Sequence, residues 1–294
     1  MLALDAHAQP AGDGTTAPPS AAAATAAAAP RHGSAQYATR AYWDARFSTE
    51  RHYEWLCEWG DVAPLLAPLL ARAPAPAPLW VLGTGTSALP AQLAAAFPAA
   101  AVLATDYSAV LIASLQAAAA AAAAAAPASA PGRLAHACAD MTDLQAALGA
   151  HAHWGRVEAV LDKGALDALV SAEGDCWEAA PELLAVSARV ARGVHAALRP
   201  GGRYVMLSFS QPHFRARHLL QRAQGGSGGG EEPPPAAAAP AEEGGGESDG
   251  EWERDLNPNP VQPAIPPVEG SLWSAFEWHR VERGLGIFLY ICTK

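Results

Sequence analysis

The sequence predicts an α/β protein built on a doubly wound, mostly parallel sheet. Three features support this prediction: apolar stretches of strand length alternate with helical segments, a glycine turn follows the first such stretch, and two strand patterns close the chain. Consecutive parallel strands need a helical crossover between them, so the alternation indicates parallel pairing. The closing pair has no helix between its strands and must be antiparallel.

The expected strands are short and separated by helices. We expect five strands, at residues 79–82, 101–105, 133–139, 157–161 and 203–210, and two more around Gly284-Leu285-Gly286 within residues 276–294. Helices are expected at residues 88–97, from 109 through the alanine run 117–126, soon after Lys163, and at 181–198. Alanine is the strongest helix former, so the run should extend its helix. The Arg-Pro-Gly-Gly segment at 199–202 should form a turn.

Composition separates one folded domain from two low-complexity segments. Residues 37–222 and 271–294 form the predicted domain, and aromatic and charged residues at helical spacing after Tyr37 predict an N-terminal helical cap. Residues 1–36 are predicted to be a disordered tail, and residues 223–270 a disordered acidic insertion rich in Gly, Pro and Ala. Such segments cannot bury enough apolar area to offset the entropy of ordering.

The acidic character of the chain is concentrated in the predicted insertion. Residues 225–256 hold nine acids and the single base Arg254, a net charge of −8 out of −10 for the whole chain. The remaining −2 offers no basic surface for nucleic acid or for a membrane. No apolar run is long enough to span a membrane, and the first residues lack the basic start of a secretory signal.

Cysteine usage favours a reducing compartment. The four cysteines are far apart and form no C-x-x-C pair: Cys57, Cys138, Cys176 and Cys292. This spacing predicts neither a zinc site nor a disulfide framework. We therefore expect a cytoplasmic protein without a bound metal, and the sequence does not indicate its oligomeric state.

The glycine turn after the first strand is typical of a nucleotide-like ligand site. Gly83 and Gly85 lack a Cβ atom, which lets the backbone turn tightly and brings its N–H groups against a ligand. Asp106 follows the second strand about 20 residues later, where an acid hydrogen-bonds ribose hydroxyls. These residues suit a dinucleotide site and an S-adenosylmethionine site equally well.

Two other features favour S-adenosylmethionine. A dinucleotide enzyme needs a second mononucleotide-binding half or a substrate domain, whereas this chain closes with an antiparallel hairpin. Asp140 follows the third strand, where an acid can meet an adenine edge in the methyltransferase arrangement, although a helix N-cap is an alternative role. A nicotinamide-dependent dehydrogenase is therefore the disfavoured interpretation.

Longer motifs then resemble a known family. Seven of them occur in the family's order and spacing: YWDARF, HYEWL, VLGTGTSALPAQL, TDYSAVLIASLQ, LDKGALDALV, LRPGGRYVMLSFSQPHFRARH and IFLYICTK. They are similar to the methyltransferase-like family that includes elongation factor 1-alpha lysine methyltransferase 4 and the N-terminal domain of methyltransferase-like protein 13. The likeness spans residues 37–221 and resumes at Phe276. It implies a class I, Rossmann-like seven-stranded methyltransferase sheet, S-adenosyl-L-methionine as cofactor, and a protein substrate, with elongation factor 1-alpha as the first candidate.

The resemblance also implies which residues form the cofactor pocket. The cap and the glycine turn would supply its walls, and the strand ends its polar contacts: Trp43, Phe47, Trp55, Gly83, Gly85, Asp106, Tyr107, Asp140, Met141 and Lys163. In this assignment Asp106 and Tyr107 meet the ribose side, and Asp140 and Met141 the adenine side. Without the motifs, the aromatic residues of the cap would be interpreted as ordinary core.

The expected chemistry is an in-line transfer of a methyl group from a sulfonium. The enzyme then mainly supplies alignment, and a lysine acceptor with a reference pKa near 10.4 must first lose a proton. Asp162, where relatives tend to have Glu, is the predicted catalytic residue at the acceptor amine. Arg215, with His213 and Arg217, is predicted to organise the loop after the fifth strand, with substrate contact as the alternative. A small-molecule methyltransferase and a non-catalytic cofactor-binding scaffold remain the competing functions.

Overall fold

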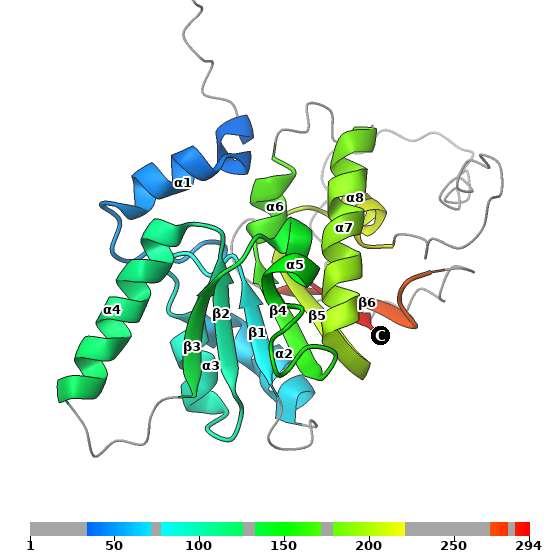
Figure 1. Ribbon diagram of the computed structural model, residues 1–294. Helices are drawn as coiled ribbons and strands as arrows, with labels where there is room; N and C mark the ends of the chain where they lie inside the picture. The colour runs from blue at the N-terminus through cyan, green and yellow to red at the C-terminus, as the bar shows by residue number, and fades with distance from the viewer. Residues whose placement is uncertain (1–33, 72–77, 126–132, 172–178, 221–270, 282–285) are drawn as a thin grey trace, which may run out of the picture. The chain divides into compact units, whose positions relative to one another are not determined.

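A seven-stranded sheet of order β3-β2-β1-β4-β5-β7-β6 forms the centre of the computed structural model (Figure 1). The structure describes residues 34–71, 78–125, 133–171, 179–220, 271–281 and 286–294. The strands are β1 Leu79–Leu82, β2 Val102–Asp106, β3 Leu134–Cys138, β4 Val157–Lys163, β5 Leu198–Ser208, β6 Ala275–Val281 and β7 Ile287–Thr293. Strands β1 to β5 pair in parallel, whereas β7 is antiparallel to both β5 and β6. The predicted α/β class and closing antiparallel pair are confirmed.

Helices precede the sheet and connect its strands. They are η1 Ser34–Ala38, α1 Arg40–Phe47, α2 Trp59–Ala71, α3 Leu89–Ala96, α4 Ala109–Ala125, η2 Met141–Asp143, α5 Leu144–Leu148, α6 Ala165–Leu169, α7 Pro181–Ala197 and α8 Pro212–Leu219. None of these described helices has the length and apolarity that crossing a membrane requires. Residues 1–33 of the predicted tail, the insertion at 223–270 and the turn residues Gly284 and Leu285 lie outside the described residues, whereas residues 34–36 of that tail belong to η1.

Two apolar layers cover the two faces of the sheet. Because side chains alternate along a strand, Trp80 of β1 faces one layer and Val81 the other. The Trp80 layer includes α7 through Val190, and the Val81 layer includes α2 through Leu66 (Figure 1). The sheet is therefore buried on both faces, as expected for parallel strands joined by helices.

Helix α2 packs against the sheet and is not part of the cap. Its buried residues Val62, Leu66 and Leu70 recur every four positions and pack on the face that α3 also covers, while Pro64 and Pro68 point outward. Of the predicted N-terminal cap, only η1, α1 and the segment 48–58 remain to cover the carboxyl ends of the strands.

The predicted turn at 199–202 is instead part of β5. Leu198 pairs with Val157 and Arg203 with Ala159, so four residues of β5 bulge opposite the single residue Glu158. Gly201 takes a φ of +73° within this bulge, and the Arg199 guanidinium binds the Glu158 carboxylate across it. A prediction from local turn propensity does not include this ion pair between strands.

We predict that Leu66→Ala destabilises the domain by about 2–5 kcal/mol, because the Leu66 side chain is fully buried between α2 and the sheet. Chemical denaturation of the full chain would measure the loss. Pro68→Ala on the exposed side of α2 is the matched control and should not lower the free energy of unfolding. Equal destabilisation by both changes would contradict this packing.

Candidate functional site

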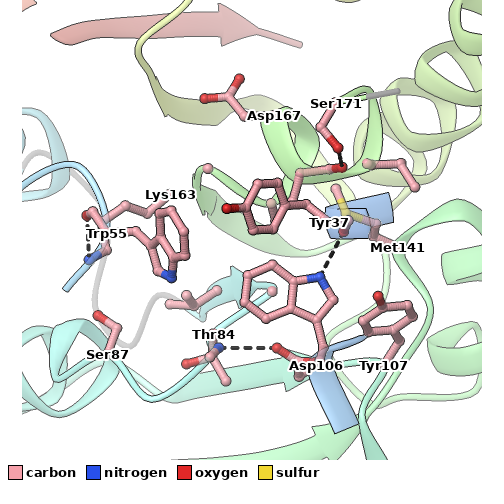
Figure 2. Close-up of a pocket in the computed structure, with 18 of the residues that line it drawn as sticks. Tyr37, Trp55, Thr84, Ser87, Asp106, Tyr107, Met141, Lys163, Asp167 and Ser171 are labelled. Carbon is pink, nitrogen blue, oxygen red and sulfur yellow. Dashed lines mark hydrogen bonds between the residues drawn. The ribbon is translucent and has the colours of Figure 1, made fainter. Parts of the chain in front are cut away.

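A cavity of about 560 Å³ opens where β1, β2 and β4 end (Figure 2). All ten residues predicted to bind the cofactor lie in its lining: Trp43, Phe47, Trp55, Gly83, Gly85, Asp106, Tyr107, Asp140, Met141 and Lys163. The predicted catalytic residue Asp162 does not. The structure thus brings the first set together, and the contacts of these residues with a ligand remain predictions.

Both glycines of the turn have a physical requirement to be glycine. Gly83 and Gly85 adopt φ values of +55° and +52°, a region that side chains disfavour. A Cβ atom on Gly83 would also lie 2.4 Å from the Cβ of Ala165 in α6. The turn can therefore approach α6 closely and expose its backbone to the cavity.

Asp106 is held rigidly at the end of β2. Its side chain is 4% exposed, its Oδ2 accepts from the Gly85 N–H at 3.1 Å, and its Oδ1 accepts from the Ser108 N–H at 3.0 Å. Burial raises the pKa of Asp106, and the nearby Asp44 carboxylate adds to the rise, whereas the backbone N–H groups oppose it. A carboxylate has about four lone-pair sites, so Asp106 can still accept from ligand hydroxyls.

Asp140, on the predicted adenine side of the cavity, makes two hydrogen bonds within the protein. Asp140 caps η2, because its Oδ1 accepts from the Thr142 N–H at 2.9 Å and from the Thr142 hydroxyl at 2.7 Å. The alternative N-cap role is therefore present in the structure. On the predicted ribose side, burial, assisted by the charge of Asp106, raises the pKa of Tyr107 to about 12, so its hydroxyl stays protonated and can donate.

Aromatic side chains from η1, α1 and the following segment form the apolar wall of the cavity. The Trp43 ring stacks on Phe47 with centroids 5.4 Å apart, and its indole N–H donates to the Tyr37 carbonyl at 2.7 Å. Trp55 packs edge-on against Tyr37 at 5.9 Å. Sequence reasoning omitted Tyr37 from the pocket, although its aromatic character at the start of the likeness was a usable signal.

Lys163 connects this wall to the sheet. Its ammonium, whose side chain is only 7% exposed, donates to the Glu54 carboxylate and to the carbonyls of Trp55 at 3.1 Å and Cys57 at 3.3 Å. Glu54 also accepts from the Ser87 hydroxyl at 2.7 Å and the Ala88 N–H at 2.6 Å. Burial would raise the pKa of Glu54, but these bonds, led by Lys163, lower it.

Asp162 occupies a different position from the one expected. The side chain is 1% exposed and lies beneath α6, where its Oδ1 accepts from the Ala165 N–H at 2.7 Å. Its Oδ2 accepts from the Tyr204 hydroxyl at 2.8 Å. Because side chains alternate along β4, Lys163 reaches the cap and Asp162 points to the opposite face. The short Asp side chain therefore accepts from the first N–H groups of α6 and lies outside the cavity lining.

Comparisons with known proteins find relatives that are named as lysine methyltransferases. The chain is 31% identical to EEF1A lysine methyltransferase 4 of Mus musculus over 190 residues, which cover 63% of this chain and 67% of that protein. The Bos taurus protein of the same name is 32% identical over 64% of this chain and 68% of its own length. Citrate synthase-lysine N-methyltransferase CSKMT, mitochondrial, of Homo sapiens is 33% identical over 64% of this chain and 77% of its own length. No protein-family model matches the chain.

We predict that Lys163→Met lowers the affinity for S-adenosylhomocysteine at least tenfold, because removing one partner of a buried ion pair costs about 3–5 kcal/mol. The substitution leaves Glu54 without its cation and releases the segment that forms the aromatic wall. Calorimetric titration would measure the affinity, and hydrogen exchange the protection of residues 50–58. Arg51→Met removes an exposed cation of the same segment and is the control. Unchanged affinity in Lys163→Met would contradict this role.

A second prediction concerns Asp162 and pH. Burial raises the pKa of Asp162 from 3.8 to about 6, so the folded protein keeps a proton there that the unfolded chain has lost. The stability that this group contributes is present below about pH 4 and is lost as the pH rises through about 6. Asp162→Asn cannot lose a proton, so its melting temperature relative to the wild type should increase across this window and then level off.

Thermal unfolding followed by circular dichroism measures this difference. Asp143→Asn, which removes an exposed carboxylate while leaving an N-cap acceptor on α5, is the matched control. The same pH dependence in both variants would show that Asp162 does not titrate as expected.

Proposed function

Because the chain belongs to the class I S-adenosylmethionine-dependent methyltransferase family that includes EEF1A lysine methyltransferase 4, we propose that it methylates a lysine side chain of a protein. S-adenosylmethionine is its cofactor, and methyl transfer is its reaction class. The lysine acceptor is supported by the names of the relatives, which give two different protein substrates but the same acceptor side chain.

The observation that carries the proposal is the cavity at the carboxyl ends of β1, β2 and β4, which suits the cofactor. The glycine turn at Gly83 brings its backbone against the cavity, Asp106 offers acceptors for ribose hydroxyls, and Met141 offers an apolar contact for a base. A volume of about 560 Å³ lies within the range of small-molecule sites. These residues fit the cofactor at one side of the cavity and leave the other side for an acceptor.

When bound, S-adenosylmethionine supplies a methyl group made electrophilic by its sulfonium. The chain must hold an acceptor nitrogen in line with that methyl group and keep water away, and such alignment can supply several kcal/mol. The rings of Tyr37, Trp43 and Trp55 give the cavity an apolar wall, which would limit the access of water. A dry site and a nearby sulfonium both lower the pKa of a lysine amine, which must be neutral to react.

Elongation factor 1-alpha is the proposed substrate because the two relatives named EEF1A lysine methyltransferase 4 match this chain. Citrate synthase, named in the other relative, is the rival protein substrate. The proposal places the protein in the cytoplasm, whereas the name of that relative includes mitochondria. Imaging of the tagged full chain against a mitochondrial marker tests the location, and overlap with the marker would favour the rival.

We predict that the full chain transfers methyl groups from S-adenosylmethionine to one lysine of elongation factor 1-alpha purified from cells lacking that modification. Peptide mass spectrometry would locate the added methyl groups, with citrate synthase incubated in parallel. Asp106→Asn should lower cofactor affinity about tenfold or more and abolish the transfer, since hydrogen bonds to a charged group are lost.

Other outcomes select the competing functions. Labelling of citrate synthase alone would show that citrate synthase, and not elongation factor 1-alpha, is the substrate. Labelling of only small molecules in an extract would indicate a small-molecule methyltransferase. Cofactor binding without any transfer would indicate a scaffold.

A further inference from the structure

A buried charged cluster lies at the side of the cavity across from Asp106 (Figure 2). It consists of Asp167 from α6, Ser208 at the end of β5 and Arg215 from α8, with Phe209 beside it. Asp167 and Phe209 both line the cavity. Neither residue was among those predicted to form the site.

Within the cluster, one oxygen of the Asp167 carboxylate is hydrogen-bonded and the other is not. Oδ1 of Asp167 accepts from Nη2 of Arg215 at 2.5 Å and from the Ser208 hydroxyl at 2.7 Å. Within the described part of the chain, Oδ2 of Asp167 and Nε and Nη1 of Arg215 are buried and have no hydrogen-bond partner. Asp167 is 5% exposed and Arg215 4%. Buried charged groups left unsatisfied are costly, so this cluster is suited to a polar ligand atom.

The other carboxylates of the cavity already have positions on the cofactor side. Asp106 is bonded to the glycine turn and Asp140 caps η2. Asp162, the residue first expected at the acceptor, lies beneath α6. Among the described acids that line the cavity, Asp167 is therefore the one that lies away from the nucleotide end and has a buried oxygen without a hydrogen-bond partner.

We infer that Oδ2 of Asp167 accepts a hydrogen bond from the acceptor lysine amine, with Arg215 as its positioning residue and Phe209 beside the lysine's methylene chain. This inference rests on the proposed lysine methylation. Phe209 is 64% exposed at the cavity, where an apolar ring can cover the long alkyl stem of a lysine while its nitrogen enters.

The ion pair with Arg215 suits this role. A lone carboxylate would stabilise the ammonium form of the lysine and oppose its deprotonation. Paired with a guanidinium, Asp167 still presents a directional lone pair but carries little net charge toward the amine. Burial raises the pKa of Asp167, while Arg215, Ser208 and the Phe209 N–H oppose the rise.

Methyl transfer takes place while the lysine amine donates to Asp167. The lysine ammonium first loses a proton to water, and one N–H of the neutral amine donates to Asp167. The nitrogen lone pair then forms the N–C bond while the C–S bond breaks and its electron pair returns to sulfur. Positive charge moves onto the nitrogen, where the carboxylate stabilises it in the transition state.

Two S-adenosylhomocysteine analogues test the inference without a protein substrate. One carries on sulfur an alkyl arm ending in a primary amine, and the other an arm of equal length ending in a methyl group. We expect the full-length wild type to bind the amine arm about tenfold more tightly, as for a hydrogen bond to a charged group. Asp167→Asn should lose this preference and keep its affinity for S-adenosylhomocysteine.

Asp143→Asn, an exposed carboxylate outside the cavity lining, is the matched control and should keep the preference. If Asp167→Asn does not fold, Asp167→Asn with Arg215→Gln removes both charges of the pair and should also lose the preference. Equal binding of the two arms by the wild type, or a preference retained in a folded Asp167 variant, would overturn the inference. Failure to methylate elongation factor 1-alpha would instead count against the proposed substrate, because the binding assay does not use it.

Discussion

The contact between Lys163 and the segment 54–57 is the interaction on which the cavity depends. The sheet supplies only the floor, through the ends of its strands, and the aromatic wall comes from chain that precedes the sheet. One ammonium binds the Glu54 carboxylate and two carbonyls, and Glu54 in turn binds the start of α3. Leu56, between those carbonyls, takes a φ of +64°, which is costly for a bulky residue. Because the Lys163 ammonium binds the carbonyls on both sides of Leu56, it holds the backbone of this residue in its strained conformation.

The motif LDKGALDALV supplies residues for several contacts around the cavity from the end of β4 and the start of α6. The alternation of β4 sends Lys163 to the cap and Asp162 beneath α6, where it caps the helix and binds Tyr204. Gly164, at a φ of +80°, turns the chain into α6 and leaves room for Leu56, which would lie 3.4 Å from a Cβ atom. The helix that follows brings Asp167 to the cavity. Placement of the cap and placement of the proposed acceptor contact are therefore consequences of the same local geometry.

Local patterns in the sequence predicted the strands, which of them pair in parallel or antiparallel, and the glycine turn, Asp106 and Asp140 in the cavity lining. The other lining residues were implied by the resemblance to the family. The glycine turn, Asp106 and Asp140 are fixed by short-range geometry at strand ends, which a sequence carries directly. The place of α2 was missed because an amphipathic helix does not indicate which sheet face it covers. The bulge at 199–202 and the burial of Asp162 depend on Glu158 and Tyr204, partners distant in sequence. Asp167 was missed for the same reason, since Arg215 lies on another helix.

The two sides of the cavity differ in how their carboxylates are compensated, and this difference follows from what each would bind. Asp106 is compensated by backbone N–H groups, which leave it a full acceptor for neutral hydroxyls whose ionisation it does not affect. An amine acceptor poses another problem, because a nearby negative charge holds it in the unreactive ammonium form. Pairing Asp167 with a buried guanidinium limits that effect before transfer. Once the nitrogen becomes cationic, the directional contact to Oδ2 gains strength, so the pair favours the transition state over the bound amine.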